Sequence, residues 1–426
     1  MVFLIPTLNQ KIKTLITLYR SELKSPLLRK PIFFILKKLG FKFHLNLVTR
    51  DELLSNKHNY YVKEFGSEEL VTANEAHVSE KTPKEIKENF FSFTVKLDKP
   101  FVCEIPDAEL VGSTATGFDR NGNIITETIV PFFFKEGYLE QNVSIRALAL
   151  KNFSRPSAIQ LDTACSLVYP WAKNYWHWIV DGLTRIEGLE AYQEQTGIKP
   201  TLIIESNLTS WQSESLKLLG YEPDECIRWN ESRVQVKKLL VPSFQRYWGY
   251  YNKTYKTYNQ VVSPMACRWL RQRILSNLPE AETEQMSFSP KIFISRRKAV
   301  QRRIINENEV MEALAPFGFV AYALEELSFS EQVRLFSQAD MVVAPHGAGL
   351  TNMIFSENLA VIELFGSYIP SFYIPGFALA NLSRGLGFRY GCLISECHPQ
   401  DSRQIHADII VDITELRDLV AKMQNV

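Results

Sequence analysis

The chain has 426 residues, which is too long for one ordinary hydrophobic core and predicts two domains. Hydrophobic residues make up 46% of the sequence and aromatic residues 12%, a composition that excludes a disordered protein. The formal net charge is +1, so the chain as a whole has no general attraction for nucleic acid or membranes. The six cysteines are scattered without a Cys-x-x-Cys pair, which argues against a zinc ribbon or a disulfide scaffold.

The first fifty residues are unusually basic. They hold ten Lys and Arg residues against one acid, Glu22, with apolar clusters such as residues 32–36 between them. We predict a basic helical segment within residues 1–80, which either lies on an anionic membrane surface or packs on the main fold with a solvated basic face. The N-terminus lacks the order of a secretory signal, and no apolar run approaches the roughly 20 residues of a membrane span. We therefore expect a cytoplasmic protein, with peripheral contact to the inner membrane face left open.

Residues 82–162 follow a pattern typical of strands and loops. Residues 91–95 and 124–130 are rich in β-branched and aromatic side chains, and residues 119–123 have the Asp, Asn and Gly of a turn. We predict a β-rich N-terminal portion within an acceptor-side lobe that covers residues 81–280.

The stretch NYWHWIVDGLTR, residues 174–185, combines aromatic, histidine and carboxylate side chains. His177 and Asp181 are four residues apart, so a helix places both on one face. An imidazole beside a carboxylate suits proton abstraction from a hydroxyl, and aromatic rings such as Trp176 and Trp178 offer apolar faces to a sugar. The alternative is an amphipathic helix whose tryptophans are core and whose polar pair caps a neighbour.

Downstream, the pattern changes to alternating strands and helices. The expected elements cover residues 201–204, 211–219, 238–241 and 263–276. A polar, proline-bounded segment near residues 278–290 marks the predicted junction. The C-terminal lobe is predicted over residues 281–400, and residues 401–426 are expected to pack back on the lobes as a strand and a helix.

A strand at residues 292–294 leads directly into a basic loop. The loop contains five cations, namely Arg296, Arg297, Lys298, Arg302 and Arg303. In α/β proteins, ligands bind at this end of a strand, and guanidinium groups make forked contacts with phosphate. We predict that the loop holds a diphosphate, and a solvated basic loop is the alternative.

The centre of the second lobe is the stretch MVVAPHGAGLTNMIFSENLAVIELF, residues 341–365. It predicts a strand, a glycine turn, a helix and a second strand, the unit of parallel α/β sheets. Glycines let the backbone approach a ligand, and a helix N-terminus attracts phosphate oxygens. The residues assigned to this phosphate site are His346, Gly347, Ala348, Gly349, Thr351 and Asn352. Glu363, on the second strand, is placed to accept hydrogen bonds from a ribose. The alternative is a tight turn with a satisfied loop histidine.

Three ordered blocks together resemble glycosyltransferase family 61. They are NYWHWIVDGLTRI, then ISRRKAVQRRIINENEV, then SEQVRLFSQADMVVAPHGAGLTNMIFS with VIELF. The similarity covers roughly residues 169–390. The family includes bacterial proteins of capsular polysaccharide biosynthesis, plant xylan-decorating transferases and the extracellular O-linked N-acetylglucosamine transferase.

The resemblance implies an α/β protein with a GT-B-like fold, in which two Rossmann-like lobes with parallel sheets accompany the β-rich portion and the basic segment. It implies a UDP- or GDP-linked sugar donor and transfer, with inversion, to the hydroxyl of a glycan or lipid-linked acceptor in polysaccharide biosynthesis. The implied donor site comprises Arg296, Arg303, residues 346–349, Asn352 and Glu363.

The implied inverting transfer also needs a base. Asp181 is favoured because carboxylates commonly serve as the base in such enzymes, with His177 orienting it and Trp176 or Trp178 lining the acceptor site. The reverse assignment, with His177 as the base and Asp181 as its partner, stays open because the spacing permits both.

The chain contains no Asp-x-Asp motif, so neither a metal nor a cofactor is expected, and cations with a helix N-terminus would stabilise the leaving diphosphate. A Rossmann oxidoreductase is disfavoured because residues 347–349 lack the third glycine of the dinucleotide fingerprint. A non-catalytic carbohydrate- or nucleotide-binding relative stays open because fold does not fix function. No nucleic-acid partner is expected. The lack of a signal puts the protein substrates of secreted family members in doubt.

Overall fold

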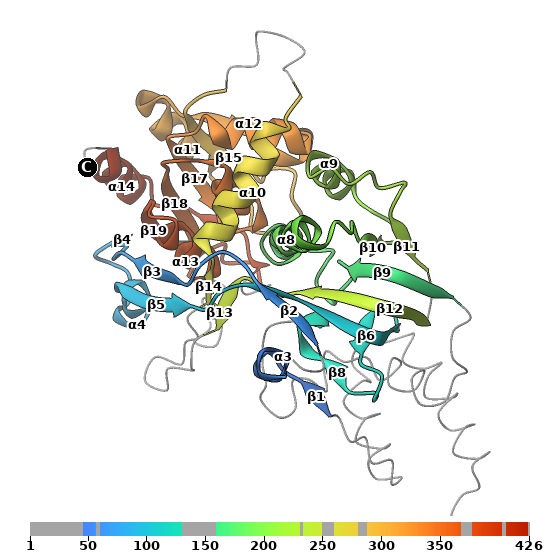
Figure 1. The fold of residues 1–426 in the computed structure, drawn as a ribbon. Helices are drawn as coiled ribbons and strands as arrows, with labels where there is room; N and C mark the ends of the chain where they lie inside the picture. Colours follow the sequence, from blue (N-terminus) through green and yellow to red (C-terminus); the bar gives the residue numbers. More distant parts are fainter. Residues whose placement is uncertain are drawn as a thin grey trace, which may run out of the picture.

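The computed structural model describes residues 46–56, 60–129, 159–230, 233–248, 260–279, 288–367, 377–402 and 406–424. The basic stretch that precedes residue 46 lies outside the described residues, so its predicted helices and membrane contact stay predictions. The described parts form two large sheets with helices around them (Figure 1). The predicted α/β class is confirmed.

The first sheet has nine strands in the order β1-β8-β7-β6-β12-β9-β10-β11, with β2 paired to β6. Its strands are β1 (Leu47–Val48), β2 (Tyr61–Glu64), β6 (Phe101–Val111), β7 (Thr116–Phe118), β8 (Ile124–Ile125), β9 (Gln160–Ser166), β10 (Thr201–Glu205), β11 (Ile227–Trp229) and β12 (Arg233–Pro242). Strands β12, β9, β10 and β11 pair in parallel, whereas β6 pairs antiparallel with β12. The strands of the β-rich N-terminal portion therefore extend the sheet of the following α/β units.

The second sheet has seven strands in the order β16-β15-β17-β18-β19-β20, with β4 paired to β19. Its strands are β4 (His77–Val78), β15 (Lys291–Ile294), β16 (Val320–Tyr322), β17 (Met341–Pro345), β18 (Ala360–Gly366), β19 (Arg389–Cys397) and β20 (Ile409–Ile410). All pairs from β16 to β19 are parallel. The strand order reverses between β15 and β17, and ligands of open α/β sheets bind at the carboxyl ends of the strands at such a switch point.

Helices and two small hairpin sheets complete the fold. The α-helices are α3 (Arg50–Ser55), α4 (Lys84–Lys87), α7 (Tyr175–His177), α8 (Ile186–Thr196), α9 (Ser210–Leu218), α10 (Pro264–Ser276), α11 (Glu307–Leu314), α12 (Phe329–Ser337), α13 (Ala378–Gly385) and α14 (Ile413–Gln424). The other helical turns are η2 (Glu88–Phe90), η3 (Thr126–Thr128), η4 (Trp178–Gly182), η5 (Leu183–Arg185), η6 (Ala315–Phe317), η7 (Leu324–Glu326) and η8 (Ala348–Phe355). Strand β3 (Glu69–Ala73) pairs with β5 (Phe93–Leu97), and β13 (Arg246–Trp248) pairs with β14 (Gln260–Val262).

The two sheets share a hydrophobic core. One buried cluster includes Ile204 of the first sheet, Leu270 of α10 and Val361 of the second sheet. Helix α10 lies along the junction and contacts α8 and α9 on one side and η8 on the other (Figure 1). A continuous core fixes the elements at this junction relative to one another.

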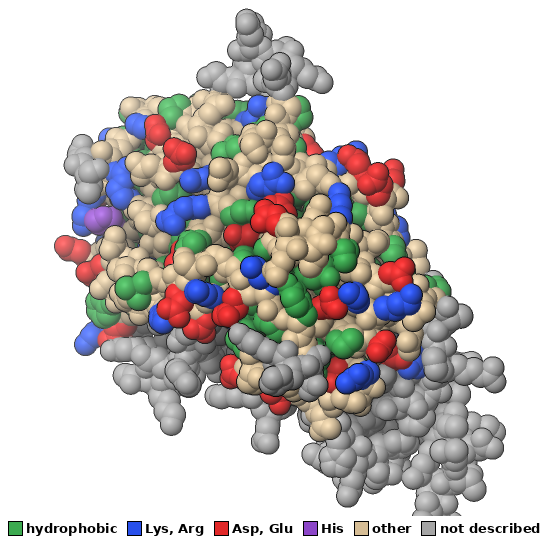
Figure 2. Space-filling model, in the orientation of Figure 1, with side chains coloured by type: hydrophobic (Ala, Val, Ile, Leu, Met, Phe, Trp, Pro, Cys, Tyr) green, Lys and Arg blue, Asp and Glu red, His purple; other side chains and the backbone are tan. Residues whose placement is uncertain are grey.

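The surface carries charges of both signs. On the face shown in Figure 2, Lys and Arg side chains are interspersed with Asp and Glu, and neither sign gathers into one broad patch. This face therefore lacks the basic stripe typical of nucleic-acid binding.

Candidate active site

The first histidine–carboxylate pair, His177 and Asp181, lies on a helical segment on the side of the first sheet. His177 ends α7, and Asp181 lies in the π-helical turn η4 that follows. The imidazole Nδ1 is 2.6 Å from Asp181 Oδ2. The predicted one-face placement of these two side chains is confirmed, although a π-turn, which is frequent at functional sites, replaces the expected regular α-helix.

Asp181 is buried and charge-paired. Asp181 is only 1% exposed. Its second carboxylate oxygen, Oδ1, is 3.2 Å from Nε of the buried Arg246. The His177 side chain is 19% exposed, so the imidazole is the member of the pair that solvent reaches. An ionised carboxylate only accepts hydrogen bonds, so in the tautomer that suits this contact His177 donates Nδ1–H to Asp181 and Nε2 is left as an acceptor.

Aromatic rings surround this pair unequally. The Trp171 ring packs against the His177 imidazole with centroids 4.6 Å apart. Trp176 lies under the Arg246 guanidinium, 5.5 Å from ring centroid to Cζ. Trp178 is fully buried and donates its indole N–H to Ser215. The structure therefore places Trp178 in the core, where no sugar reaches its ring. Trp171 replaces it as the candidate ring for the acceptor site.

The second pair spans two neighbouring strands of the second sheet. His346 Nδ1 is 2.5 Å from Glu363 Oε1, and the Tyr390 hydroxyl donates to Glu363 Oε2 at 2.6 Å. Glu363 is fully buried, and the His346 ring stacks on Phe365 with centroids 4.9 Å apart. Glu363 thus lies behind His346 with both oxygens occupied, which does not fit the predicted direct contact with a ribose.

Two arginines converge on the turn after β17. Arg302 Nη1 donates to the His346 carbonyl oxygen at 2.9 Å, and a Cβ added at Gly347 would lie 3.2 Å from Arg296 Nη1. Burial lowers the pKa of the Arg296 guanidinium, and the neighbouring Arg302 lowers it further. Two guanidinium groups that converge on one turn are typical of an anion site.

Arg303, which was predicted for this site, has a different partner. Its Nε and Nη2 donate to Asp408 Oδ2 at 3.0 and 2.6 Å. The φ angle of Arg302 is 54°, in the left-handed region. This backbone conformation sets the directions in which the neighbouring side chains of the loop point, and the sequence of the loop does not reveal it. The sequence identified the basic loop, which includes Arg302, but the donor site implied by the resemblance named Arg296 and Arg303.

The rest of the predicted phosphate turn is tightly packed. Segment η8 is a 3₁₀-helix over Ala348–Phe355, and Thr351 and Asn352 within it are fully buried. A Cβ at Gly349 would lie 2.7 Å from Leu324 Cδ1. Gly349 is therefore needed for packing against Leu324, which corrects its predicted role of leaving room for a ligand.

A direct contact joins the two halves of the site. The Tyr175 hydroxyl donates to Asn352 Oδ1 at 2.5 Å, and Asn352 Nδ2 donates to Gln332 at 2.9 Å. Tyr175 begins the helical segment of His177, and Asn352 follows the turn of His346. The pair His177–Asp181 and the arginine-lined turn therefore lie on adjoining elements.

The described part of the chain holds neither a candidate metal site nor a candidate membrane-spanning helix. No three His, Cys, Asp or Glu side chains there are grouped so that they would hold a metal ion. No helix among these residues has the length and apolarity needed to cross a bilayer.

Comparison with known proteins finds similarity over the residues of the site. Residues 175–362 match the model of the family described as Glycosyltransferase 61. The chain is 31% identical over 140 residues to the EGF domain-specific O-linked N-acetylglucosamine transferase of Gallus gallus, a stretch that covers 32% of this chain and 25% of that protein. It is 38% identical over 98 residues to the Protein O-linked-mannose beta-1,4-N-acetylglucosaminyltransferase 2 of Xenopus laevis, which covers 22% of this chain and 17% of that protein.

The chain thus spans about a quarter or less of the length of these relatives. The matched segment contains His177, Asp181, both converging arginines and the turn at His346. The predicted resemblance is confirmed, because residues 175–362 of this chain match the glycosyltransferase family 61 model.

Proposed function

We propose that this chain is an inverting, metal-independent glycosyltransferase that moves a sugar from a nucleotide-sugar donor to an acceptor hydroxyl. The observation that carries this function is the Tyr175–Asn352 contact, because it joins a pair suited to take a proton to a turn suited to hold a diphosphate. Deprotonation of the acceptor and stabilisation of the leaving group then occur at one junction. The two sheets would correspond to the two lobes of a GT-B fold.

The donor diphosphate is assigned to the turn at His346 and Gly347, with Arg296 and Arg302 on its oxygens. Both arginines lie at the carboxyl ends of β15 and β17, where the strand order reverses. Guanidinium groups bind phosphate oxygens through two parallel N–H donors. Arg302 takes the place that the sequence assigned to Arg303, since Arg303 is paired with Asp408.

His346 is assigned as a third cation of the donor site. Glu363 behind it is fully buried, and a buried carboxylate needs a positive partner. Its other neighbour, Tyr390, stays a neutral donor because burial and the Glu363 carboxylate raise the pKa of Tyr390 well above its usual value. The arriving diphosphate offsets the repulsion between His346 and the two arginines, so that His346 takes up a proton as the donor binds.

His177 is assigned as the general base, the second of the two options that the sequence left open. Asp181 is buried, and its oxygens face His177 and Arg246. An acceptor hydroxyl would therefore meet the imidazole first. In this assignment Asp181 orients the ring and stabilises the imidazolium that forms, as the buried carboxylate of a catalytic triad does.

The acceptor is assigned to the aromatic surface beside His177. Trp171 is the best placed ring for sugar stacking because it touches the imidazole and is only partly buried. The names of the relatives state transfer of N-acetylglucosamine to EGF domains and to O-linked mannose on protein. N-acetylglucosamine is therefore the first donor sugar to test. A glycan or lipid-linked acceptor in polysaccharide biosynthesis and a cytoplasmic, membrane-peripheral location stay part of the proposal.

The decisive assay measures nucleotide release. The purified chain is incubated with UDP-N-acetylglucosamine and with other UDP- and GDP-sugars, each with and without a mixture of glycan and glycolipid acceptors. We expect acceptor-stimulated release of UDP or GDP from one donor, and His177→Gln should lose release while still binding the nucleotide. Donor binding without release under every condition would instead indicate a non-catalytic carbohydrate- or nucleotide-binding protein. Absence of both would contradict the donor site itself.

A further inference from the structure

Arg246 lies behind the proposed base and was not singled out by the sequence. Its side chain is 1% exposed, and its Nε is 3.2 Å from Asp181 Oδ1. Burial lowers the pKa of the Arg246 guanidinium, and Asp181 acts in the opposite direction. Arginine keeps its charge in proteins, so the buried carboxylate of Asp181 has a permanent cation at one oxygen and the His177 ring at the other.

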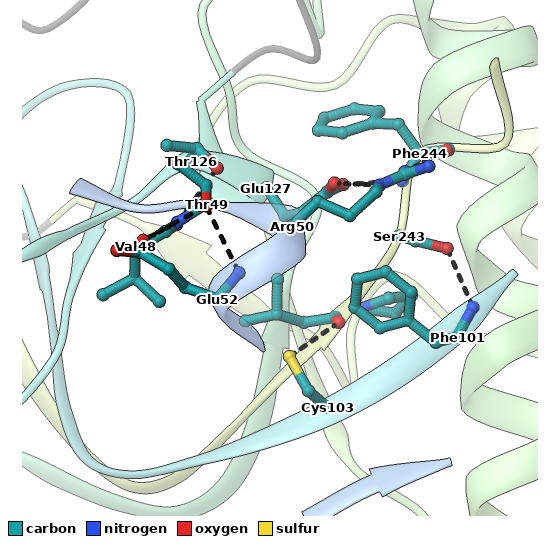
Figure 3. Close-up of polar contacts among 12 residues, drawn as sticks. Val48, Thr49, Arg50, Glu52, Phe101, Cys103, Thr126, Glu127, Ser243 and Phe244 are labelled. Atoms are coloured by element: carbon teal, nitrogen blue, oxygen red, sulfur yellow. Dashed lines mark hydrogen bonds and ion pairs between the residues drawn. The ribbon is translucent and has the colours of Figure 1, made fainter. Parts of the chain in front are cut away.

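The segment before Arg246 is held rigidly. Glu127 accepts the backbone N–H of Phe244 at 2.9 Å and pairs with Arg50 at 2.8 Å, while Arg50 also donates to the Phe244 carbonyl oxygen. Ser243 accepts the backbone N–H of Phe101 at 3.0 Å. Figure 3 shows these contacts side by side. An arginine on an anchored segment loses little freedom when it pairs, which suits a positioning role.

Charge balance decides the proton on His177. A buried carboxylate that lacked Arg246 would draw a second proton onto the imidazole, because a desolvated negative charge favours a positive neighbour. With Arg246 present, the Asp181 charge is already compensated.

We propose that Arg246 is a positioning residue that keeps Asp181 ionised and His177 neutral, so that His177 accepts the proton of the acceptor hydroxyl, an assignment that rests on the proposed function. Arg246 touches neither donor nor acceptor in this account. It acts on the reaction only through Asp181.

Arg246 is buried, but a pocket adjoins it. Arg246 forms part of the lining of this pocket together with Glu69 and Glu187, two carboxylates that would admit a small cation. The remaining titratable groups around Arg246 are Tyr169 and Cys267. Burial raises the pKa of Cys267 to about 12 and raises that of Tyr169 well above its usual value, so both are neutral near pH 7.

The test reads the His177 ring directly. In protein with ¹⁵N-labelled histidine, we expect wild-type His177 to carry one proton, on Nδ1, at pH 7. Arg246→Met should move the midpoint at which His177 gains its second proton upward by about one pH unit or more, a tenfold or greater change in proton affinity. Arg246→Lys should restore most of the wild-type behaviour. An unchanged midpoint in Arg246→Met would overturn the assignment.

A second measurement covers the case in which Arg246→Met does not fold. In Arg246→Ala, added guanidinium chloride at millimolar concentration should enter through the pocket and return the His177 midpoint toward the wild-type value. Absence of rescue in a folded Arg246→Ala protein contradicts the proposal.

Arg233→Met provides the matched control, because Arg233 is also a buried arginine paired with a carboxylate, Glu109, at 2.7 Å. It should leave His177 unchanged, and an equal shift in this control would also contradict the proposal. The readout needs neither donor nor acceptor, so failure of the proposed transferase activity would be seen separately.

Discussion

The two histidine–carboxylate pairs use the same contact in different electrostatic settings. His177 and His346 each direct Nδ1 to a buried carboxylate, at 2.6 and 2.5 Å. The third member differs, because Asp181 faces the guanidinium of Arg246 whereas Glu363 faces the phenol of Tyr390. A cation satisfies the charge of a buried carboxylate and a neutral hydroxyl does not. In the proposed assignments, the first histidine serves as the base and the second as a cation of the phosphate site.

The largest expected effect separates catalysis from binding. His177→Gln should lower kcat by about 10² to 10⁴-fold, the usual contribution of general base catalysis, and leave the affinity for UDP unchanged because the donor turn is untouched. Steady-state rates and calorimetry with UDP measure the two quantities. If His177→Gln kept its turnover while Asp181→Asn lost it, the base would be Asp181 after all.

The next effect concerns the arginines of the donor turn. Arg296→Met and Arg302→Met should each weaken UDP binding by about 10 to 100-fold, since a hydrogen bond to a charged group contributes roughly 1.5–3 kcal/mol. Arg303→Met is the matched control from the same loop, and its affinity should stay near wild type because that side chain is paired with Asp408. A larger loss in Arg303→Met than in Arg302→Met would reverse the assignment of these two neighbours.

A smaller effect is expected at the second histidine. His346→Gln should weaken UDP binding by about tenfold, the value of one charged contact, and should abolish proton uptake on binding. Titration calorimetry in two buffers of different ionisation enthalpy counts that proton. Equal proton uptake in wild type and His346→Gln would show that His346 is not the group that gains the proton.

The smallest functional effect is expected at Gly349. Gly349→Val should lower the free energy of unfolding by about 1–3 kcal/mol through overpacking against Leu324, with UDP affinity of the folded protein retained. Denaturant unfolding and calorimetry measure the two. Gly349→Val combined with Leu324→Ala should recover part of the stability. Loss of UDP binding in a fully folded Gly349→Val would restore the role that the sequence suggested for this glycine.

The sequence revealed the local part of the site. His177 and Asp181 are four residues apart, and helical geometry alone brings them together. The strand, turn and strand around His346 were likewise recognisable because glycines and β-branched runs have strong local preferences. The parallel second sheet follows from such units.

The remainder of the site depends on tertiary contacts. Glu363 was seen as a strand residue, but its direction behind His346 is set by the pairing of Ala344 with Glu363 across two strands. Arg246 lies on a separate small hairpin, and the i, i+4 spacing of His177 and Asp181 does not predict its contact with Asp181. The choice between Arg302 and Arg303 depends on one left-handed residue in a loop. No local pattern encodes these three features.

The most direct test of the comparison is one spectrum of the histidine side chains with UDP bound at pH 7. Nitrogen-15 shifts distinguish an imidazole with one proton from an imidazolium with two, and His177→Gln and His346→Gln assign the two signals. We expect His177 to carry a single proton on Nδ1 and His346 to carry protons on both nitrogens. A charged His177 together with a neutral His346 would contradict the account.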